Sequence, residues 1–432
     1  LDDLVALCRI PSVSALDAPS VRASAKAFAD VLRRYGLQKV RLLESDNAHP
    51  SVYGEWSVAE GDAARRPTLL IYGHHDVQPP GAIDRWASPP FEPEVRNGRL
   101  YGRGTADDKG GIMAHIAAVG SQLGRDGTLP CNVKFLIEGE EEIGSPHLGN
   151  ILRDYGDLLG ADYVVLNDTP NFATGVPALT YRLRGMCHVD VEVQCLTQPL
   201  HSGRGGGVVP DPVAILCHLI DSVDLEVDGI TPLSPDEKAR LDALPFTHEF
   251  PLADGVELLA RDVQWERLWT RPSMTVIGFD AHPIAGSFNQ ILPSARARLS
   301  IRTVPNLDSR AAGEAIARQL IDAGPPHARV RAEVVSAAPW FRIEPQGPAF
   351  DAAMRALERG YGRKPVLIGA GGTIGFVGTF AEQFAGVPLL LMGVEDPPCN
   401  AHSENESLHL GDWEKCTRSA MVLYEELGRL AT

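Results

Sequence analysis

Apolar runs that alternate with amphipathic segments organise the first part of the chain. The apolar runs at 40–43, 68–72, 132–137 and 162–166 predict strands, and helical spacing of apolar residues covers 21–35, 111–123 and 149–158. Buried strands separated by helices are typical of a mainly parallel sheet with helices on both faces. We therefore expect an α/β fold here.

The pattern changes near Tyr181. Residues 187–195 alternate between apolar and polar side chains, as a half-exposed antiparallel strand does. Strand patterns at 273–279, 295–303 and 328–335 and helical patterns at 211–223 and 309–323 follow, which indicates an α+β domain. After Trp340 the α/β pattern returns, with helices predicted at 348–361 and from about 412, and strands at 365–368 and 387–394. We expect one α/β domain, 1–181 and 339–432, interrupted by an inserted domain, 182–338.

Composition excludes several classes of partner. The 432 residues carry a formal net charge of -16 and no basic run, so nucleic acid is not an expected partner. No stretch approaches the roughly 20 continuous apolar residues that a membrane span needs, so no membrane contact is expected. None of the seven cysteines forms a Cys-x-x-Cys pair, which favours a reducing, cytoplasmic location and argues against a thiolate zinc site.

Metal-capable side chains follow four of the apolar runs. His74 and Asp76 come after 68–72, the acidic residues at 138 and 140–142 after 132–137, Asp168 after 162–166, and His402 after 387–394. Ligands of open α/β sheets bind beyond the carboxyl ends of the strands, so these side chains can converge on one crevice. Histidine and carboxylate without cysteine suit zinc, manganese or cobalt.

Each of these signals has an ordinary structural explanation when taken alone. A histidine after a strand is commonly a hydrogen-bonded loop residue, an acidic run is commonly a solvated turn, and Asp107-Asp108 could cap the following helix. Neighbouring residues of a strand point to opposite faces, so His74 and His75 do not bind the same ion. The coincidence of all these positions favours a joint metal site.

Eight motifs occur in order along nearly the whole chain. They are His74-x-Asp76-Val-Gln-Pro, Trp86-x-x-Pro-Pro-Phe, Gly98-Arg-Leu-Tyr-Gly-Arg-Gly104, Asp107-Asp108-Lys109-Gly110, Glu141-Glu142-x-Gly144-Ser145, Asn167-Asp168, Leu200-His201-Ser202-Gly203 and Ala401-His402-Ser403-x-Asn405-Glu406. With them the chain resembles the di-zinc metallopeptidases that include carnosinase, cytosolic non-specific dipeptidase, carboxypeptidase G and aminoacylase, and the dipeptidase branch most closely. The resemblance implies a phosphorylase/hydrolase-like di-zinc exopeptidase domain carrying an inserted, ferredoxin-like lid and dimerisation domain.

The same resemblance implies a set of five metal ligands. One divalent ion is held by His74 and Asp168, and a second by Glu142 and His402. Asp107 bridges the two ions together with a water or hydroxide. A shared carboxylate suits the chemistry, because it offsets the repulsion between two dications that together lower the pKa of the bound water. The implied cofactors are two zinc ions, with manganese or cobalt as alternatives.

Two further acidic side chains receive roles from the resemblance. Asp76 is expected to fix the ring of His74, as partners of ligating histidines do. Glu141 is expected to act as the general base that deprotonates the water and then protonates the leaving amine. The resemblance also implies a cis peptide bond between Asp107 and Asp108.

The implied substrate contacts come mainly from the inserted domain. His201 resembles a lid histidine that reaches the reacting carbonyl oxygen from the partner subunit of a homodimer. Arg302 matches an arginine that binds the substrate carboxylate, and Gly371, Gly372 and Thr373 match a turn at the same end of the substrate. Asn289 lies where the family has a polar lid residue, although Gln290 fits that position equally well.

The expected activity is hydrolysis of the amide bond in dipeptides or similar small substrates with a free carboxylate. Some dipeptidases carry an acidic residue before the Gly-Gly turn, where this chain has Ala370, which leaves N-acyl substrates open. The alternatives are therefore an N-acyl-amino-acid deacylase or a carboxypeptidase on the same scaffold. A non-catalytic binding protein is a third alternative, against which the intact ligand set and Glu141 argue.

Overall fold

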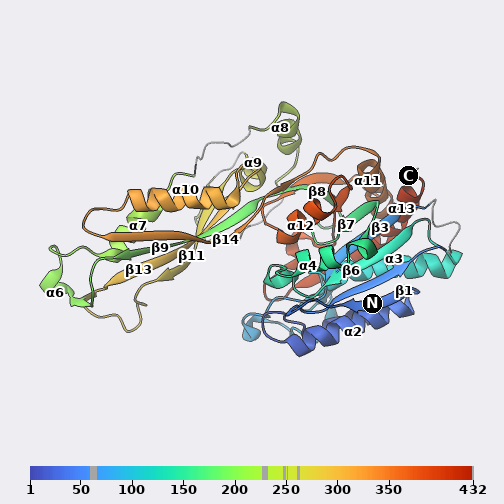
Figure 1. The fold of residues 1–432 in the computed structure, drawn as a ribbon, viewed down its shortest axis with the longest axis horizontal. Coiled ribbons are helices and arrows are strands. Elements are labelled where there is room, and N and C mark those ends of the chain that lie inside the picture. Colours follow the sequence, from blue (N-terminus) through green and yellow to red (C-terminus); the bar gives the residue numbers. More distant parts are fainter. Residues whose placement is uncertain (59–65, 226–231, 247–249, 251, 260–262, 431–432) are drawn as a thin grey trace. The chain divides into compact units, whose positions relative to one another are not determined.

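The chain divides into two compact units, which are described separately. The computed structural model describes residues 1–58, 66–225, 232–246, 250, 252–259 and 263–430 (Figure 1). The first unit comprises Leu1–Tyr181, Ile343–Ile368 and Gly375–Thr432, and the second comprises Arg182–Arg342 and Gly369–Ile374. Compared with the boundaries expected from the sequence, the second unit extends to 342 rather than 338 and includes the short segment 369–374. No described helix is long and apolar enough to cross a membrane.

A mixed sheet with a parallel centre forms the first unit. β6, β3, β7 and β17 run parallel to one another, and β2 and β8 join this centre antiparallel on either side. The strands of this sheet are β1 (Gln38–Leu43), β2 (Ser51–Trp56), β3 (Thr68–His74), β6 (Asn132–Glu138), β7 (Tyr163–Leu166), β8 (Ala178–Leu183), β16 (Val366–Ala370) and β17 (Leu389–Leu391), and β15 (Phe341–Arg342) pairs with the last residues of β8. A smaller sheet contains β4 (Glu94–Arg96), β5 (Arg99–Tyr101) and β18 (Ser407–His409).

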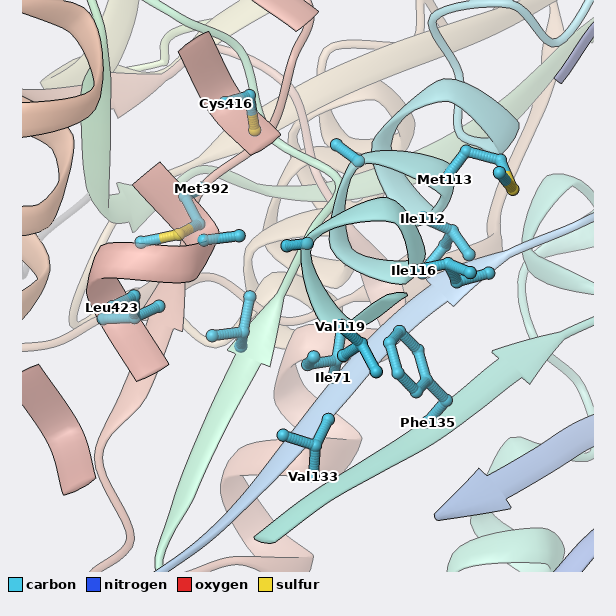
Figure 2. Close-up of a cluster of buried hydrophobic side chains, with 14 of the residues drawn as sticks. Ile71, Ile112, Met113, Ile116, Val119, Val133, Phe135, Met392, Cys416 and Leu423 are labelled. Carbon is cyan, nitrogen blue, oxygen red and sulfur yellow. The ribbon is translucent and has the colours of Figure 1, made fainter. Parts of the chain in front are cut away.

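Helices cover both faces of this sheet, as the sequence pattern predicts. Side chains of β3 alternate between the faces, so that Ile71 joins the core beneath α3 while the ring of Tyr72 packs against Phe376 of α12. Figure 2 shows α3 lying over β3 and β6, with contacts among Ile112, Ile116, Val119, Ile71, Val133 and Phe135. The helices are α1 (Asp2–Cys8), α2 (Ala18–Arg34), α3 (Lys109–Asp126), α4 (Leu148–Asp154), α5 (Gly156–Leu159), α11 (Pro348–Tyr361), α12 (Gly375–Gln383) and α13 (Leu410–Gly428).

The second unit has a ferredoxin-like core. Its order along the chain is β9 (Gly185–Gln194), α7 (Pro212–Asp221), β11 (Ser273–Asp280), β13 (Ser294–Thr303), α10 (Ser309–Asp322) and β14 (Arg329–Ala338). The antiparallel sheet has the order β11-β13-β9-β14, and α7 and α10 contribute Leu216 and Ile316 to the core on one face. Shorter elements complete the unit: β10 (Leu200–His201), α6 (Ser202–Gly205), α8 (Pro235–Asp242), α9 (Gln264–Thr270) and β12 (Gln290–Ile291).

Several elements differ from the sequence expectation. β2 and β8 were not predicted, and α12 forms where only a glycine turn was expected between 368 and 387. The predicted strand 387–394 is β17, which spans only Leu389–Leu391. The rest of that apolar run continues past the sheet toward Glu395, whose carbonyl accepts the Asn171 N–H at 2.6 Å.

Candidate metal centre

The carboxyl ends of the parallel strands place the predicted ligands close together. β3 ends at His74, β6 leads into the short 3-10 helix η3 (Glu141–Ile143), and Asp168 lies two residues beyond β7. His402 arrives from the segment that follows β17, with a positive φ of 61°. The topology of the first unit therefore brings His74, Glu142, Asp168 and His402 to one edge of the sheet.

Asp107 stands between two histidines. Its Oδ1 lies 2.9 Å from His74 Nε2, and its Oδ2 lies 2.9 Å from His402 Nε2. His402 Nε2 is also 3.2 Å from Glu142 Oε2. In the described part of the chain, two triads have ligand atoms within 4.8 Å of one another: His74, Asp107 and Asp168, and Asp107, Glu142 and His402. All five ligands expected from the sequence are thus brought together, with Asp107 shared.

Glu406 fixes the backbone that carries Asp107. The fully buried Glu406 carboxylate accepts N–H groups from Gly104 at 2.9 Å, Ala106 at 2.9 Å and Asp107 at 3.1 Å. Arg103 pairs with the same carboxylate at 2.7 Å. The Asp107–Asp108 peptide bond is cis, as the resemblance implies.

Asp76 and Gln78 hold the acidic turn after β6. Asp76 accepts the backbone N–H groups of Glu141 at 3.2 Å and Glu142 at 3.1 Å. Its carboxylate lies 3.4 Å from His74 Nδ1, whereas its own carbonyl oxygen lies nearer, at 3.1 Å. Gln78 donates from Nε2 to Glu142 Oε2 at 2.9 Å. Asp76 therefore contacts the His74 ring as expected, and it also orders the turn that carries Glu141.

The buried carboxylates strongly affect one another's protonation. Burial and the neighbouring Asp107 hold the pKa of Asp168 well above its usual value. Burial raises the pKa of Glu141 to about 8, with further contributions from Glu142 and Asp107. Burial opposes ionisation of Asp107 as well, but hydrogen bonds from His402 and His74 bring its pKa below the usual range. Ionisation of all of these carboxyls together is therefore unfavourable with the charges of the site's own residues alone.

This donor set fits two divalent cations. It offers two imidazoles and three carboxylates with no thiolate, which is the chemistry that zinc, manganese and cobalt accept. No lysine or arginine of the described part forms an ion pair with Asp107, Glu142 or Asp168. Cations bound between these carboxyls would favour their ionised form and compensate its charge.

The second unit holds the predicted substrate-binding residues in two places. Arg302 of β13 donates from Nη1 to Thr373 Oγ1 at 2.8 Å, so Arg302 and the Gly371–Thr373 turn are in contact. His201 pairs with Gln290 across β10 and β12, and Asn289 accepts the N–H of the following Ser202 at 3.1 Å. The exposed His201 ring uses Nδ1 to accept the Gly203 N–H, which leaves Nε2 directed away from that turn.

Some residues of the centre were missed by the sequence reasoning. Glu406 and Gln78 fall within quoted motifs, but no role was assigned to them, and their position in those motifs was the available signal. Glu395 was also missed, although it follows the apolar run before His402. Burial and the charge of Asp107 hold the pKa of the Glu395 carboxyl well above its ordinary value.

Comparison with known proteins identifies the family. The model of the peptidase family M20/M25/M40 matches residues 70–426, which is most of the chain and includes all five candidate ligands. The chain belongs to this family. It is therefore a metallopeptidase, with a mainly parallel sheet covered by helices.

Relatives in this family include dipeptidases. A cysteinylglycine-S-conjugate dipeptidase from Corynebacterium striatum is 32% identical over 394 residues, covering 89% of this chain and 85% of the relative. The human Beta-Ala-His dipeptidase is 31% identical over 396 residues, covering 86% and 76%. The solved structure of the di-peptidase Dug1p from Saccharomyces cerevisiae superimposes with a TM-score of 0.84 at 25% identity, covering 99% of this chain and 95% of that one.

Proposed function

We propose that this M20 peptidase hydrolyses dipeptides that carry a free carboxylate, using two divalent ions. The observation that carries the proposal is the shared carboxylate of Asp107, whose two oxygens each face a different histidine at 2.9 Å. Two ions held through such a shared carboxylate would supply the chemistry that cleaves amide bonds with water. The names of the relatives direct the proposal toward dipeptides.

His74 and Asp168 would hold one ion, Glu142 and His402 the other, and Asp107 both. When bound, ions of this kind, for which zinc is our first choice ahead of manganese or cobalt, lower the pKa of a water molecule enough to make it a nucleophile near neutral pH. Glu141, next to a ligand, accepts the proton of this water as its oxygen attacks the amide carbonyl. When the C–N bond breaks, Glu141 returns the proton to the leaving amine.

The second unit, taken as an inserted lid and dimerisation domain over 182–338, would bind the rest of the substrate. Arg302 and the Gly371-Gly372-Thr373 turn hold the carboxylate, since a guanidinium offers paired donors to it. His201, with Asn289 beside it, would reach the developing oxyanion from the partner subunit of a homodimer. We place this activity in the cytoplasm, in keeping with the reduced cysteines.

A pair of substrates tests the reaction class. The protein is loaded with zinc or manganese and given a free dipeptide and its N-acetyl analogue under the same conditions. We expect the higher kcat/KM for the free dipeptide. A higher kcat/KM for the acetylated compound would instead favour the deacylase or carboxypeptidase alternative, which the absence of an acidic side chain at Ala370 keeps worth testing.

Glu141→Gln tests the proposed base. The amide cannot accept the proton, so kcat should fall about 10²- to 10⁴-fold while both ions stay bound. Metal content is measured by elemental analysis beside the kinetics. The matched control is Glu414→Gln, the same change on the exposed side of α13, where Glu414 pairs with Arg418 four residues on. Full turnover by metal-loaded Glu141→Gln would refute the proposed mechanism.

A further inference from the structure

A second arginine braces the turn that Arg302 contacts. The side chain of Arg184, which immediately precedes β9, is largely buried in the second unit with 7% of the residue exposed. Its Nε donates to the carbonyl of Gly371 at 2.9 Å. Its Nη1 donates to Ser273 Oγ at 3.0 Å and to the Arg271 carbonyl at 3.2 Å. One guanidinium therefore ties the glycine turn to the start of β11.

The backbone of Arg184 completes a closed set of contacts. Its carbonyl accepts a hydrogen bond from Thr373 Oγ1 at 2.7 Å, and the same hydroxyl accepts one from Arg302 Nη1 at 2.8 Å. Ser273 is in turn the cross-strand partner of Arg302 in the β11–β13 pair. Arg184 thus holds both ends of the arrangement, the Gly371–Thr373 turn and the strand position facing Arg302.

The two guanidiniums are poorly compensated. Within the described residues neither Arg184 nor Arg302 forms an ion pair with a carboxylate. Burial lowers the pKa of Arg184 to about 10, and the charge of Arg302 contributes in the same direction. Burial lowers the pKa of Arg302 as well. Two partly buried cations so arranged favour an anion between or beside them, and a carboxylate has the matching geometry.

We propose that Arg184 is a positioning residue for the substrate carboxylate: it fixes the Gly371–Thr373 turn and, through Thr373, the orientation of Arg302. The inference rests on the proposed function, because it presumes that the carboxylate of the substrate binds at Arg302. A side chain that only stabilised the fold of the second unit would not discriminate between substrates with and without that carboxylate. The substrate carboxylate therefore supplies the test.

The experiment compares a dipeptide with its C-terminal carboxamide in the metal-loaded protein. We expect the wild type to show a kcat/KM about 10- to 100-fold higher for the dipeptide, the range of a charged hydrogen-bonded contact. In Arg184→Met, KM for the dipeptide should rise roughly tenfold with kcat nearly kept, because uniform binding is lost. The preference for the dipeptide over the carboxamide should fall toward unity.

Two further variants make the result decisive. Ser273→Ala removes one acceptor of the Arg184 guanidinium but leaves the positive charge of Arg184 in place. It should reduce the preference for the dipeptide by a smaller factor. This variant also keeps the test available if Arg184→Met does not fold. Arg310→Met, an equivalent change at an exposed position of α10, should leave the preference unchanged.

The outcomes separate the two ideas. A wild type that treats dipeptide and carboxamide alike would overturn the carboxylate-binding part of the proposed function. A wild type that prefers the dipeptide, together with folded Arg184→Met and Ser273→Ala proteins that keep the whole of that preference, would overturn the positioning role alone. The positioning role is supported if Arg184→Met loses preference for the dipeptide and has a raised KM for it, while its thermal stability is unchanged.

Discussion

At the scale of single residues, the candidate centre depends on side chains that are not among its five candidate ligands. Glu406 is the clearest of them, because its carboxylate is completely buried and accepts the backbone N–H groups of Gly104, Ala106 and Asp107. A residue of this kind sets the direction in which the shared carboxylate points. Loss of such a partner ordinarily costs 10- to 100-fold in metal affinity.

Glu406→Gln should therefore weaken metal binding about 10- to 100-fold while the protein stays folded. The amide of glutamine keeps one oxygen acceptor but directs an NH₂ group at a backbone N–H, so part of the Asp107 loop loses its support. Competition with a chromophoric chelator measures the affinity, and circular dichroism checks the fold. Glu414→Gln, the same change at an exposed position of α13, is the matched control. An unchanged metal affinity in Glu406→Gln would show that the Asp107 loop keeps its conformation without the Glu406 carboxylate.

The sequence allowed the five candidate ligands to be placed because each lies directly after an apolar run or in a recognisable motif. Glu406 lies in one of these motifs, but nothing in the motif itself indicates what the side chain does. Its task is to accept backbone N–H groups from a segment 300 residues earlier, such as Ala106, and a contact of that kind depends on the three-dimensional path of the chain. The same reason applies to Arg184, whose partners are mainly carbonyl oxygens.

At the scale of elements, the close approach of α3 to the strand ends places the aspartate loop. An added Cβ at Gly111 would lie 2.1 Å from Asp108 Oδ1 and 2.3 Å from Asn167 Nδ2, distances that no real side chain tolerates. Gly124, in the same helix, is exposed and would place a Cβ with nothing within 4 Å. Close packing therefore requires glycine at position 111, whereas a larger side chain has room at position 124.

Gly111→Ala should destabilise the protein by about 1–3 kcal/mol, the usual cost of overpacking, despite the better helix propensity of alanine. Gly124→Ala should stabilise it by about 0.5–1 kcal/mol, because only the backbone preference changes. Urea unfolding with a chelator present measures both without a contribution from bound metal. A Gly111→Ala protein at least as stable as the wild type would contradict the tight packing of α3 on this loop.

Elements with a strong apolar pattern were predicted well, and those set by their neighbours were not. β3, β6 and α11 follow the expected spans closely, since buried strands and amphipathic helices have clear periods. β2 carries Gly54 and Glu55 within its span, which weakens the strand pattern, yet it pairs with β6 and is buried throughout. α12 begins at Gly375 after a glycine-rich turn, and its buried residues Phe376 and Phe380 pack their rings against Tyr72 of β3.

At the scale of the whole molecule, the proposed reaction draws on residues of both units. The candidate metal ligands and Glu141 belong to the first unit, and His201 and Arg302 belong to the second. Our proposal assigns His201 to the catalytic site of the partner subunit, so activity would require a dimer rather than only a folded chain. Closed dimers of identical subunits contain two equivalent sites, which makes this assignment testable with mixed subunits.

Mixed dimers of Glu141→Gln and His201→Ala chains should regain activity that neither parent has. In such a dimer the site of the His201→Ala chain keeps its own Glu141 and receives an intact His201 from its partner, whereas the second site lacks both groups. Co-expression with two different tags and purification through both should give about half of the wild-type kcat, because one of two sites is intact. Doubly tagged Glu141→Gln dimers are the control and should stay inactive. Mixed dimers as inactive as their parents would place His201 in the site of its own chain, and a single-tag eluate with no mixed species would argue against the dimer itself.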